Sequence, residues 1–186
     1  MLLLNYLKVD IMDKKVIGIG AIVAIIIIAI IAVVAMGGMG GSGGILGNAT
    51  NATAAEVVTN KTYDFEYCTL ELPNTTNVVN LSNNEDGFEA MLYIIADNAT
   101  NSSFTMAVAT GDNMISSADE YVGNMNSQGN DVEKVEDYGK WVIVKNNDNS
   151  SYKYMAVNIE GGHGFLISHD DMGTLKQIVD TYKFKS

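Results

Sequence analysis

The residues with the clearest chemical signal are asparagines that stand two positions before a serine or threonine, the acceptor pattern for N-linked glycan. The stretches NATNAT (48–53) and NATNSS (98–103) hold two such sequons each. The eight acceptors are Asn48, Asn51, Asn60, Asn74, Asn80, Asn98, Asn101 and Asn149. Chance pairing of the 18 Asn with the 22 Ser or Thr of residues 45–186 would give about three sequons. The excess predicts glycosylation.

A glycan is bulky and needs an exposed attachment site. We expect the first three acceptors in a flexible tether and the other five in turns, because none of them interrupts an apolar run. Asn, Ser and Thr also favour turns for conformational reasons. That alternative explains where the sequons stand better than it explains how many there are.

The two histidines are the next candidates for chemistry. His163 and His169 stand six residues apart in a predicted strand, so roughly 20 Å would separate them and one metal ion could not bind both. Asp170 and Asp171 could form a carboxylate–imidazole site with His169, but capping of the helix that follows is the simpler interpretation. The turn GGHG (161–164) lacks the spacing of a phosphate-binding loop.

No arrangement of nucleophile, base and acid can be argued from spacing. NNEDG (83–87) and NNDN (146–149) could each offer oxygen atoms to Ca²⁺, but neither matches an EF-hand loop and both are expected to be solvated turns. We therefore predict no catalytic residue, no metal site and no cofactor, and expect that the protein is not an enzyme.

Composition narrows the possible functions further. The formal net charge is −11 with eleven lysines and no arginine, so nucleic-acid binding is not expected. Cys68 is the single cysteine, which excludes an intramolecular disulfide. It is expected to pack as a small apolar side chain, with a reactive thiol as the alternative.

Residues 16–36 read VIGIGAIVAIIIIAIIAVVAM and carry no charge. As a helix they would span about 31 Å, which matches a bilayer core of about 30 Å. Lysines precede this segment and none follows it before Lys61, so residues 1–15 are predicted to be cytoplasmic and the rest extracellular. A cleaved signal peptide is the alternative, although its apolar region would be unusually long.

The segment 37–60 is predicted to be a flexible tether, glycine-rich at first and then rich in sequons. Residues 61–186 have the pattern of a folded domain. Residues 63–73 alternate with one shift of phase, as in a strand with a bulge or a break. The runs 88–96 and 103–110 predict a hairpin, and the first of them should be buried on both faces.

A helix is predicted over 116–129, with Ser117 and Glu120 as a capping box. A meander of strands over 132–139, 140–146, 152–160 and 163–169 should follow. After Asp171, apolar residues at helical spacing predict a last helix. We predict an α+β domain in which an antiparallel sheet of about six strands carries two helices. The aromatic set Tyr63, Phe65 and Tyr67, together with Tyr152 and Tyr154, is expected in the core, with a binding platform as the alternative.

Four motifs resemble the PsbP/Mog1-like domain. They are TLELP (69–73), SADEY (117–121), YGKWVIV (138–144) and IVDTYKF (178–184). The resemblance covers the predicted extracellular domain and implies an α/β/α sandwich with an accessory or binding role and no shared catalytic site. The whole arrangement of anchor, tether and sequon-rich domain is similar to small archaeal cell-surface proteins.

Together these observations predict a single-pass, N-glycosylated protein of the cell membrane. Its partners would be membrane lipid, through residues 16–36, and an envelope protein or wall component, through the outer domain. The alternatives are an envelope enzyme with an unrecognised site and a pilin-like surface subunit. The apolar helices of pilins usually carry a glutamate near their start. Residues 16–36 have no glutamate, which argues against a pilin-like subunit.

Overall fold

The structure, a computed structural model, describes residues 58–186 with the exception of 82, 86–87, 101, 112–113 and 149–151. Most of the predicted cytoplasmic, membrane and tether segments therefore lie outside the described residues. The strands and helices are, in chain order, β1 (Asn60–Asp64), β2 (Cys68–Pro73), β3 (Thr76–Asn80), β4 (Asn83–Glu85), β5 (Phe88–Asp97), β6 (Ser102–Thr110), α2 (Ala118–Ser127), β7 (Val132–Tyr138), β8 (Trp141–Asn146), β9 (Tyr154–Glu160), β10 (His163–His169), α3 (Met172–Asp180) and β11 (Lys183–Phe184). Among the described residues, no helix is long and apolar enough to cross a membrane.

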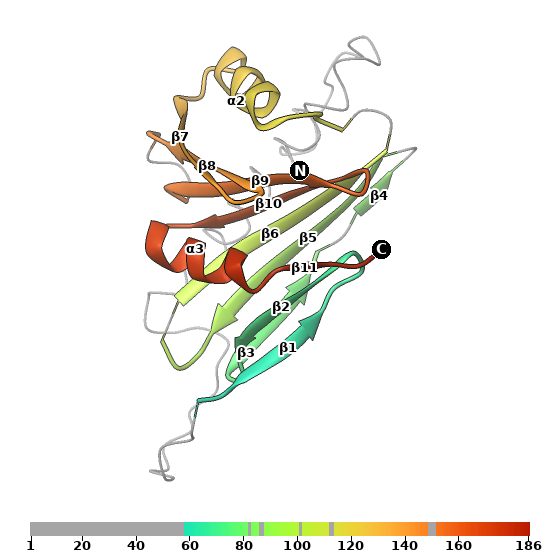
Figure 1. Ribbon diagram of the computed structural model, residues 1–186, viewed down its shortest axis with the longest axis vertical. Helices are drawn as coiled ribbons and strands as arrows, with labels where there is room; N and C mark the ends of the chain where they lie inside the picture. The colour runs from blue at the N-terminus through green and yellow to red at the C-terminus, as the bar shows by residue number, and fades with distance from the viewer. Residues whose placement is uncertain (1–57, 82, 86–87, 101, 112–113, 149–151) are drawn as a thin grey trace, which may run out of the picture.

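The larger of two sheets has eight strands, in the order β3-β5-β6-β10-β9-β8-β7, and β4 also pairs with β5. Every pairing is antiparallel. The predicted hairpin of β5 and β6 and the predicted meander of β7 to β10 are both confirmed. The strand count is larger than the six expected, because β3 and β4 come from a polar stretch that reads as loop. The β8 strand lies one position in from the β7 edge (Figure 1).

A second sheet of three strands has the order β1-β2-β11. It corrects the interpretation of residues 63–73 as one interrupted strand. The alternation changes phase because the chain turns at 65–67, where the Phe65 N–H donates to the Cys68 carbonyl at 2.9 Å. The tail after α3 then adds β11 to the other side of β2. Asn60 begins β1, so this acceptor, expected in the tether, lies in a strand.

The small sheet and α3 cover one face of the large sheet, the face nearer the viewer in Figure 1. A core of 19 buried residues lies between the layers. It includes Ile95, Met106, Phe165 and Leu175, each at most 1 % exposed. Helix α3 begins at the predicted N-cap, where the Asp171 carboxylate accepts the Thr174 N–H at 2.7 Å.

Helix α2 packs on the opposite face, over β8, β9 and β10. Tyr121 and Met125 join Val144, Val157 and Leu166 in a smaller core there. Ser117 caps the helix by accepting the Glu120 N–H, as predicted. The reciprocal bond of the capping box is displaced by one residue, because the Glu120 carboxylate accepts the N–H of Ser116.

Candidate functional site

The acceptor asparagines that the structure describes are all exposed. They are Asn60, Asn74, Asn80 and Asn98, whereas Asn48, Asn51, Asn101 and Asn149 lie outside the described residues. Exposure leaves room for a glycan at each of the four positions.

Three of these acceptors lie together at one end of the domain. Asn60 stands opposite Pro73 in the pairing of β1 with β2, and the Asn74 N–H donates to the Thr59 carbonyl at 2.8 Å. The Asn98 N–H points to the Thr75 carbonyl at 3.4 Å. The β1 start, the β2–β3 turn and the β5–β6 turn thus form one surface, which we call the sequon end. The described chain also begins there (Figure 1).

Aromatic side chains gather at the opposite end, around the β9–β10 turn. The rings of Tyr67 and His163 stack with centroids 4.0 Å apart, and Phe184 lies 6.0 Å from the imidazole. His163 Nδ1 is buried and has no hydrogen-bond partner among the described residues. We call Tyr67, His163 and Phe184, all partly exposed, the aromatic end.

Glycine at position 161 is what lets the aromatic end close. Gly161 has φ +60°, and a Cβ atom added there would lie 2.1 Å from Cζ of Phe184. The backbone conformation strains an L side chain, and the Phe184 ring would have to move to admit one. The β9–β10 turn and the β11 tail therefore fix each other in place.

A charged group borders this end. Lys140 Nζ lies 2.6 Å from Oε2 of Glu160 and 4.4 Å from the centre of the Tyr182 ring. Burial disfavours ionisation of Glu160, but the hydrogen bond and charge of Lys140 outweigh it and leave its pKa below the ordinary value. Burial, and then the charge of Glu160, raises the pKa of Tyr182. Glu160 is therefore an ionised, paired carboxylate and is poorly suited to act as a general acid near neutral pH.

One further contact, between Ser102 and His169, was not predicted from the sequence. Ser102 Oγ lies 3.0 Å from His169 Nε2, a distance typical of a nucleophile and its base. The pair was missed because 67 residues separate its members and no local motif marks either.

The protonation of His169 argues against such a role. Its Nδ1 atom accepts the Asp171 N–H at 2.8 Å, and a backbone N–H can only donate. Nδ1 also lies 3.1 Å from the Asp171 carbonyl, but the contact with the N–H is the shorter of the two and favours a lone pair on Nδ1 and a proton on Nε2. With that tautomer, Nε2–H donates to Ser102. A general base would need the lone pair on Nε2.

This tautomer can be tested directly. We expect long-range ¹H–¹⁵N spectra at neutral pH to show His169 protonated at Nε2, and Ser102→Ala to shift that nitrogen without changing the tautomer. Ser102→Ala keeps the Asn101 sequon, because Ser103 supplies its hydroxyl. Protonation at Nδ1 would contradict the assignment and restore Ser102 and His169 as a candidate catalytic pair.

The other residues that were candidates for chemistry make contacts that support the fold. Asp171 caps α3 as predicted, while Asp170 accepts the Lys153 N–H at 3.2 Å and lies before the first turn. His163 and His169 occupy the two ends of β10. Within the described ranges, no group of three His, Cys, Asp or Glu residues could hold a metal ion. The stretches NNEDG and NNDN, expected to be solvated turns, lie partly outside those ranges. Of their described residues, Asn83–Glu85 form β4 and Asn146 ends β8.

Cys68 packs in the core as predicted. It is fully buried, and its Sγ lies 3.9 Å from Sδ of Met106. Burial raises the pKa of this thiol to about 12. The thiolate, which is the reactive form, is therefore scarce at neutral pH.

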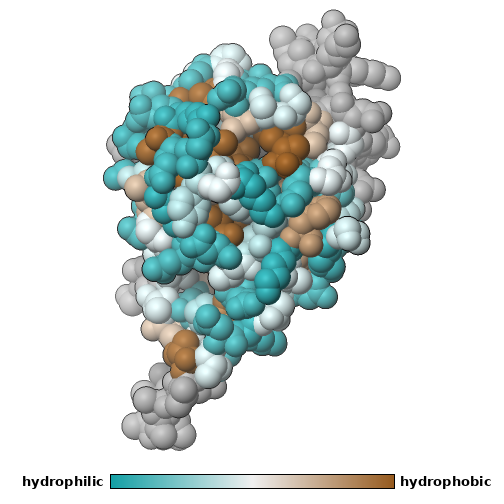
Figure 2. All heavy atoms as spheres, in the orientation of Figure 1, coloured by the Kyte–Doolittle hydropathy of each residue, from teal (hydrophilic) through white to brown (hydrophobic). Residues whose placement is uncertain are grey.

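The aromatic residues of 63–67 contact the core, as expected. Phe65 is buried with its ring edge-to-face on Tyr93 at 4.9 Å, and Tyr63 bonds through its hydroxyl to the carbonyls of Pro73 and Thr76. Tyr67 packs against the core and also forms part of the aromatic end. The visible face of the domain is otherwise mainly hydrophilic (Figure 2).

Comparisons with known proteins give no family for this chain. It matches no family model, no curated protein and no solved structure.

Proposed function

We propose that this protein is a single-pass, N-glycosylated protein of the cell surface whose outer domain binds an envelope protein or wall component without catalysing a reaction. Residues 16–36 would be the anchor and 37–59 the tether. The observation that supports this most is the separation of the two ends. Three exposed acceptors share the sequon end, and among the described acceptors none lies at the aromatic end.

This separation has a physical consequence for binding. Glycans exclude other macromolecules from the surface around them, so the sequon end would be a poor docking surface. The aromatic end offers stacked rings beside the Lys140–Glu160 pair. Rings with one apolar face and one polar edge are the side chains most often used in binding surfaces. We infer that the partner binds there.

The resemblance to PsbP/Mog1-like domains is part of the same proposal. Helices on both faces of an antiparallel sheet suit an α/β/α arrangement, and an accessory or binding role would follow from it. The eight-stranded sheet and the added three-stranded sheet go beyond the strand number expected on that basis.

Glycosylation and topology can be tested on the native protein. We expect mass spectrometry to find glycan on Asn74 and Asn98, and protease added to intact cells to remove the domain. Asn74→Gln should lose the mass of one glycan. Asn77→Gln is the matched control, since Asn77 is an exposed asparagine of β3 outside any sequon. Bare asparagines together with a protected domain would contradict the proposal.

The binding end can be tested with a photo-crosslinking amino acid placed in the full chain in its native envelope. We expect adducts from position 66, beside Tyr67, and few from position 77, beside the sequon end; Glu66 and Asn77 are both exposed. Tyr67→Ala should lower the yield from position 66 at least fivefold. Equal yields from both positions, or adducts from position 77 alone, would exclude the aromatic end as the binding surface.

A further inference from the structure

Each of the two sheets ends in strands that have a free edge. In the small sheet these strands are β1 and β11, and in the large sheet they are β3 and β7. A free edge can pair with a strand of another chain, and charged side chains or a bulge usually prevent this. Lys61 and Asp64 lie in β1, and Lys183 lies in β11. The β7 strand has four charged residues and a bulge between Lys134 and Glu136.

The β3 strand has none of these protective features. Its sequence, TNVVN, contains no charged residue and no proline, and its pairing with β5 runs without a bulge. Val78 packs against the core, whereas Val79 points to the other face and is 51 % exposed. Leu81, just after the strand, is 41 % exposed. Among the edge strands of the described chain, β3 is therefore the one best suited to pair with another chain.

The hydrogen bonds to β5 indicate which main-chain groups of β3 face outward. The Leu81 N–H donates to the Leu92 carbonyl at 2.7 Å. Because such bonds alternate along an antiparallel pair, the N–H and C=O of Val78 point away from β5. The Thr76 carbonyl points the same way and accepts the Tyr63 hydroxyl at 2.9 Å. A new strand pairing must therefore form at the centre of β3, around Val78.

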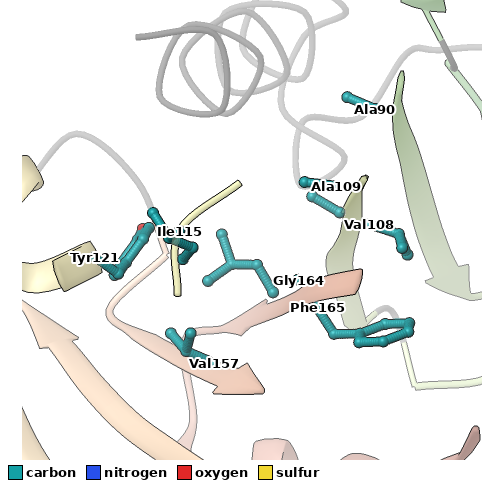
Figure 3. A pocket seen from close by; sticks show the side chains of 10 residues that line it. Ala90, Val108, Ala109, Ile115, Tyr121, Val157, Gly164 and Phe165 are labelled. Carbon is teal, nitrogen blue, oxygen red and sulfur yellow. The ribbon is translucent and has the colours of Figure 1, made fainter. Parts of the chain in front are cut away.

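The pocket beside α2 offers no comparable surface. Its volume is about 20 Å³, enough for a group the size of a methyl. Figure 3 shows Ile115 and Tyr121 on one side of the pocket, Ala90 and Ala109 on the other, and Gly164 between them. A macromolecule cannot enter a space of this size, whereas a strand edge needs no pocket.

We propose that β3 of one copy of the chain pairs antiparallel with β3 of a second copy, with Val78 opposite Val78. This register overlaps all five residues of the strand, and any shifted register overlaps fewer. Val79 of each copy then stands opposite Asn77 of the other, which partly covers the exposed valine, and no charged side chains of β3 face each other. The large sheet becomes continuous across two copies. The pairing goes beyond the proposed function, which involves no second copy.

The sequon at Asn80 would control this pairing. In the proposed register, Asn80 of one copy stands opposite Thr76 of the other. Asn80 is exposed, but Thr76 is only 8 % exposed, so the surroundings of Thr76 have no room for a glycan. A chain with glycan on Asn80 therefore stays single, and a bare chain pairs. This second step rests on the glycosylation proposed above, whereas the pairing itself does not.

The pairing is tested with the full chain, made in a host without N-glycosylation and purified in detergent. On oxidation, Val78→Cys should give an intermolecular disulfide, because the Cα atoms of such a pair lie about 5.5 Å apart, within the disulfide range. Val135→Cys, on the exposed β7 edge, is the matched control and should give about a tenth of that yield or less. Cys68 is fully buried and stays in every variant, so the unsubstituted chain gives the background.

A charge on the β3 edge gives a second measure of the same contact. Adding Val79→Lys to Val78→Cys should lower the disulfide yield about fivefold or more, because a lysine on an edge strand opposes pairing. Adding Val135→Lys to Val78→Cys places the same charge on the β7 edge and should leave the yield unchanged.

The role of the glycan is tested with Val78→Cys expressed in native cells. We expect no cross-link while Asn80 carries a glycan, and a cross-link once Asn80→Gln removes the acceptor. Asn98→Gln is the matched control, because it removes a sequon of the β5–β6 turn and should leave the chains uncross-linked. Mass spectrometry of the same samples measures the occupancy of Asn80.

Three results would overturn the pairing: no disulfide at position 78 in the bare chain, equal yields from positions 78 and 135, or a yield that Val79→Lys leaves unchanged. Native chains that cross-link with glycan on Asn80, or that carry no glycan there, would overturn the role of the glycan. The surface-protein assignment is tested separately, by glycan on Asn74 and Asn98 and by protease on intact cells, so the two failures are distinguishable.

Discussion

Phe165→Ala should lower the free energy of unfolding by about 3–5 kcal/mol, the usual cost of removing a fully buried aromatic side chain. Phe165 is 1 % exposed, and its ring packs edge-to-face on Tyr182 at 5.1 Å and on Phe184 at 6.2 Å. The substitution therefore opens a cavity between β10, the end of α3 and β11. A loss of this size is a large part of the 5–15 kcal/mol that holds a typical domain together.

Urea denaturation of the domain in the full chain, followed by Trp141 fluorescence, would measure this change. Val135→Ala is the control, because Val135 is 44 % exposed on β7 and should change the free energy by less than about 0.5 kcal/mol. If Phe165→Ala cost no more than the control, the assignment of β10 to the centre of the core would be wrong.

Gly161→Ala should have the second largest effect, a loss of about 2–4 kcal/mol. Part of it is the strain of a left-handed backbone at φ +60°, about 1 kcal/mol. The rest is lost packing, because the new methyl group and the Phe184 ring cannot both keep their places. We expect β11 to separate from β2 and the Tyr67–His163 stack to loosen.

Two comparisons separate these causes. Gly162→Ala has φ +79° with open space around the new methyl group, so it should cost only the strain. Adding Phe184→Ala to Gly161→Ala should cost less than the sum of the single substitutions, since the collision disappears. Chemical denaturation gives all four values. Strict additivity would show that Phe184 does not determine the effect.

The sequence predicted the parts of the fold that depend on local patterns. The β5–β6 hairpin was found because two apolar runs flank ATNSS, and α2 and α3 because Ser117 and Asp171 precede helical stripes. Each of these signals lies within one element and its cap. Exposure of the four described acceptors also agrees with the prediction. Their placement agrees only in part, because Asn74 and Asn98 lie in turns whereas Asn60 begins β1 and Asn80, expected in a turn, ends β3.

The missed features depend on contacts between distant residues. Lys183 and Phe184 form a strand because β2 offers them an open edge, which the two residues themselves do not reveal. Ser102 meets His169 through the pairing of β6 with β10. The aromatic end likewise assembles from the β1–β2 turn, β10 and β11, so its members could be recognised as aromatic but not as neighbours.

The pairing of β1 with β2 bears on how the domain would carry load. The chain enters β1 at the sequon end, and five residue pairs join β1 to β2 along its length. A pull from the membrane side against a partner held at the other end would act along β1, parallel to the strands. Those pairs would then be sheared together instead of opening one after another. If the domain is tethered through its N-terminal side as proposed, its first strand would act as a mechanical clamp against a pull along that direction.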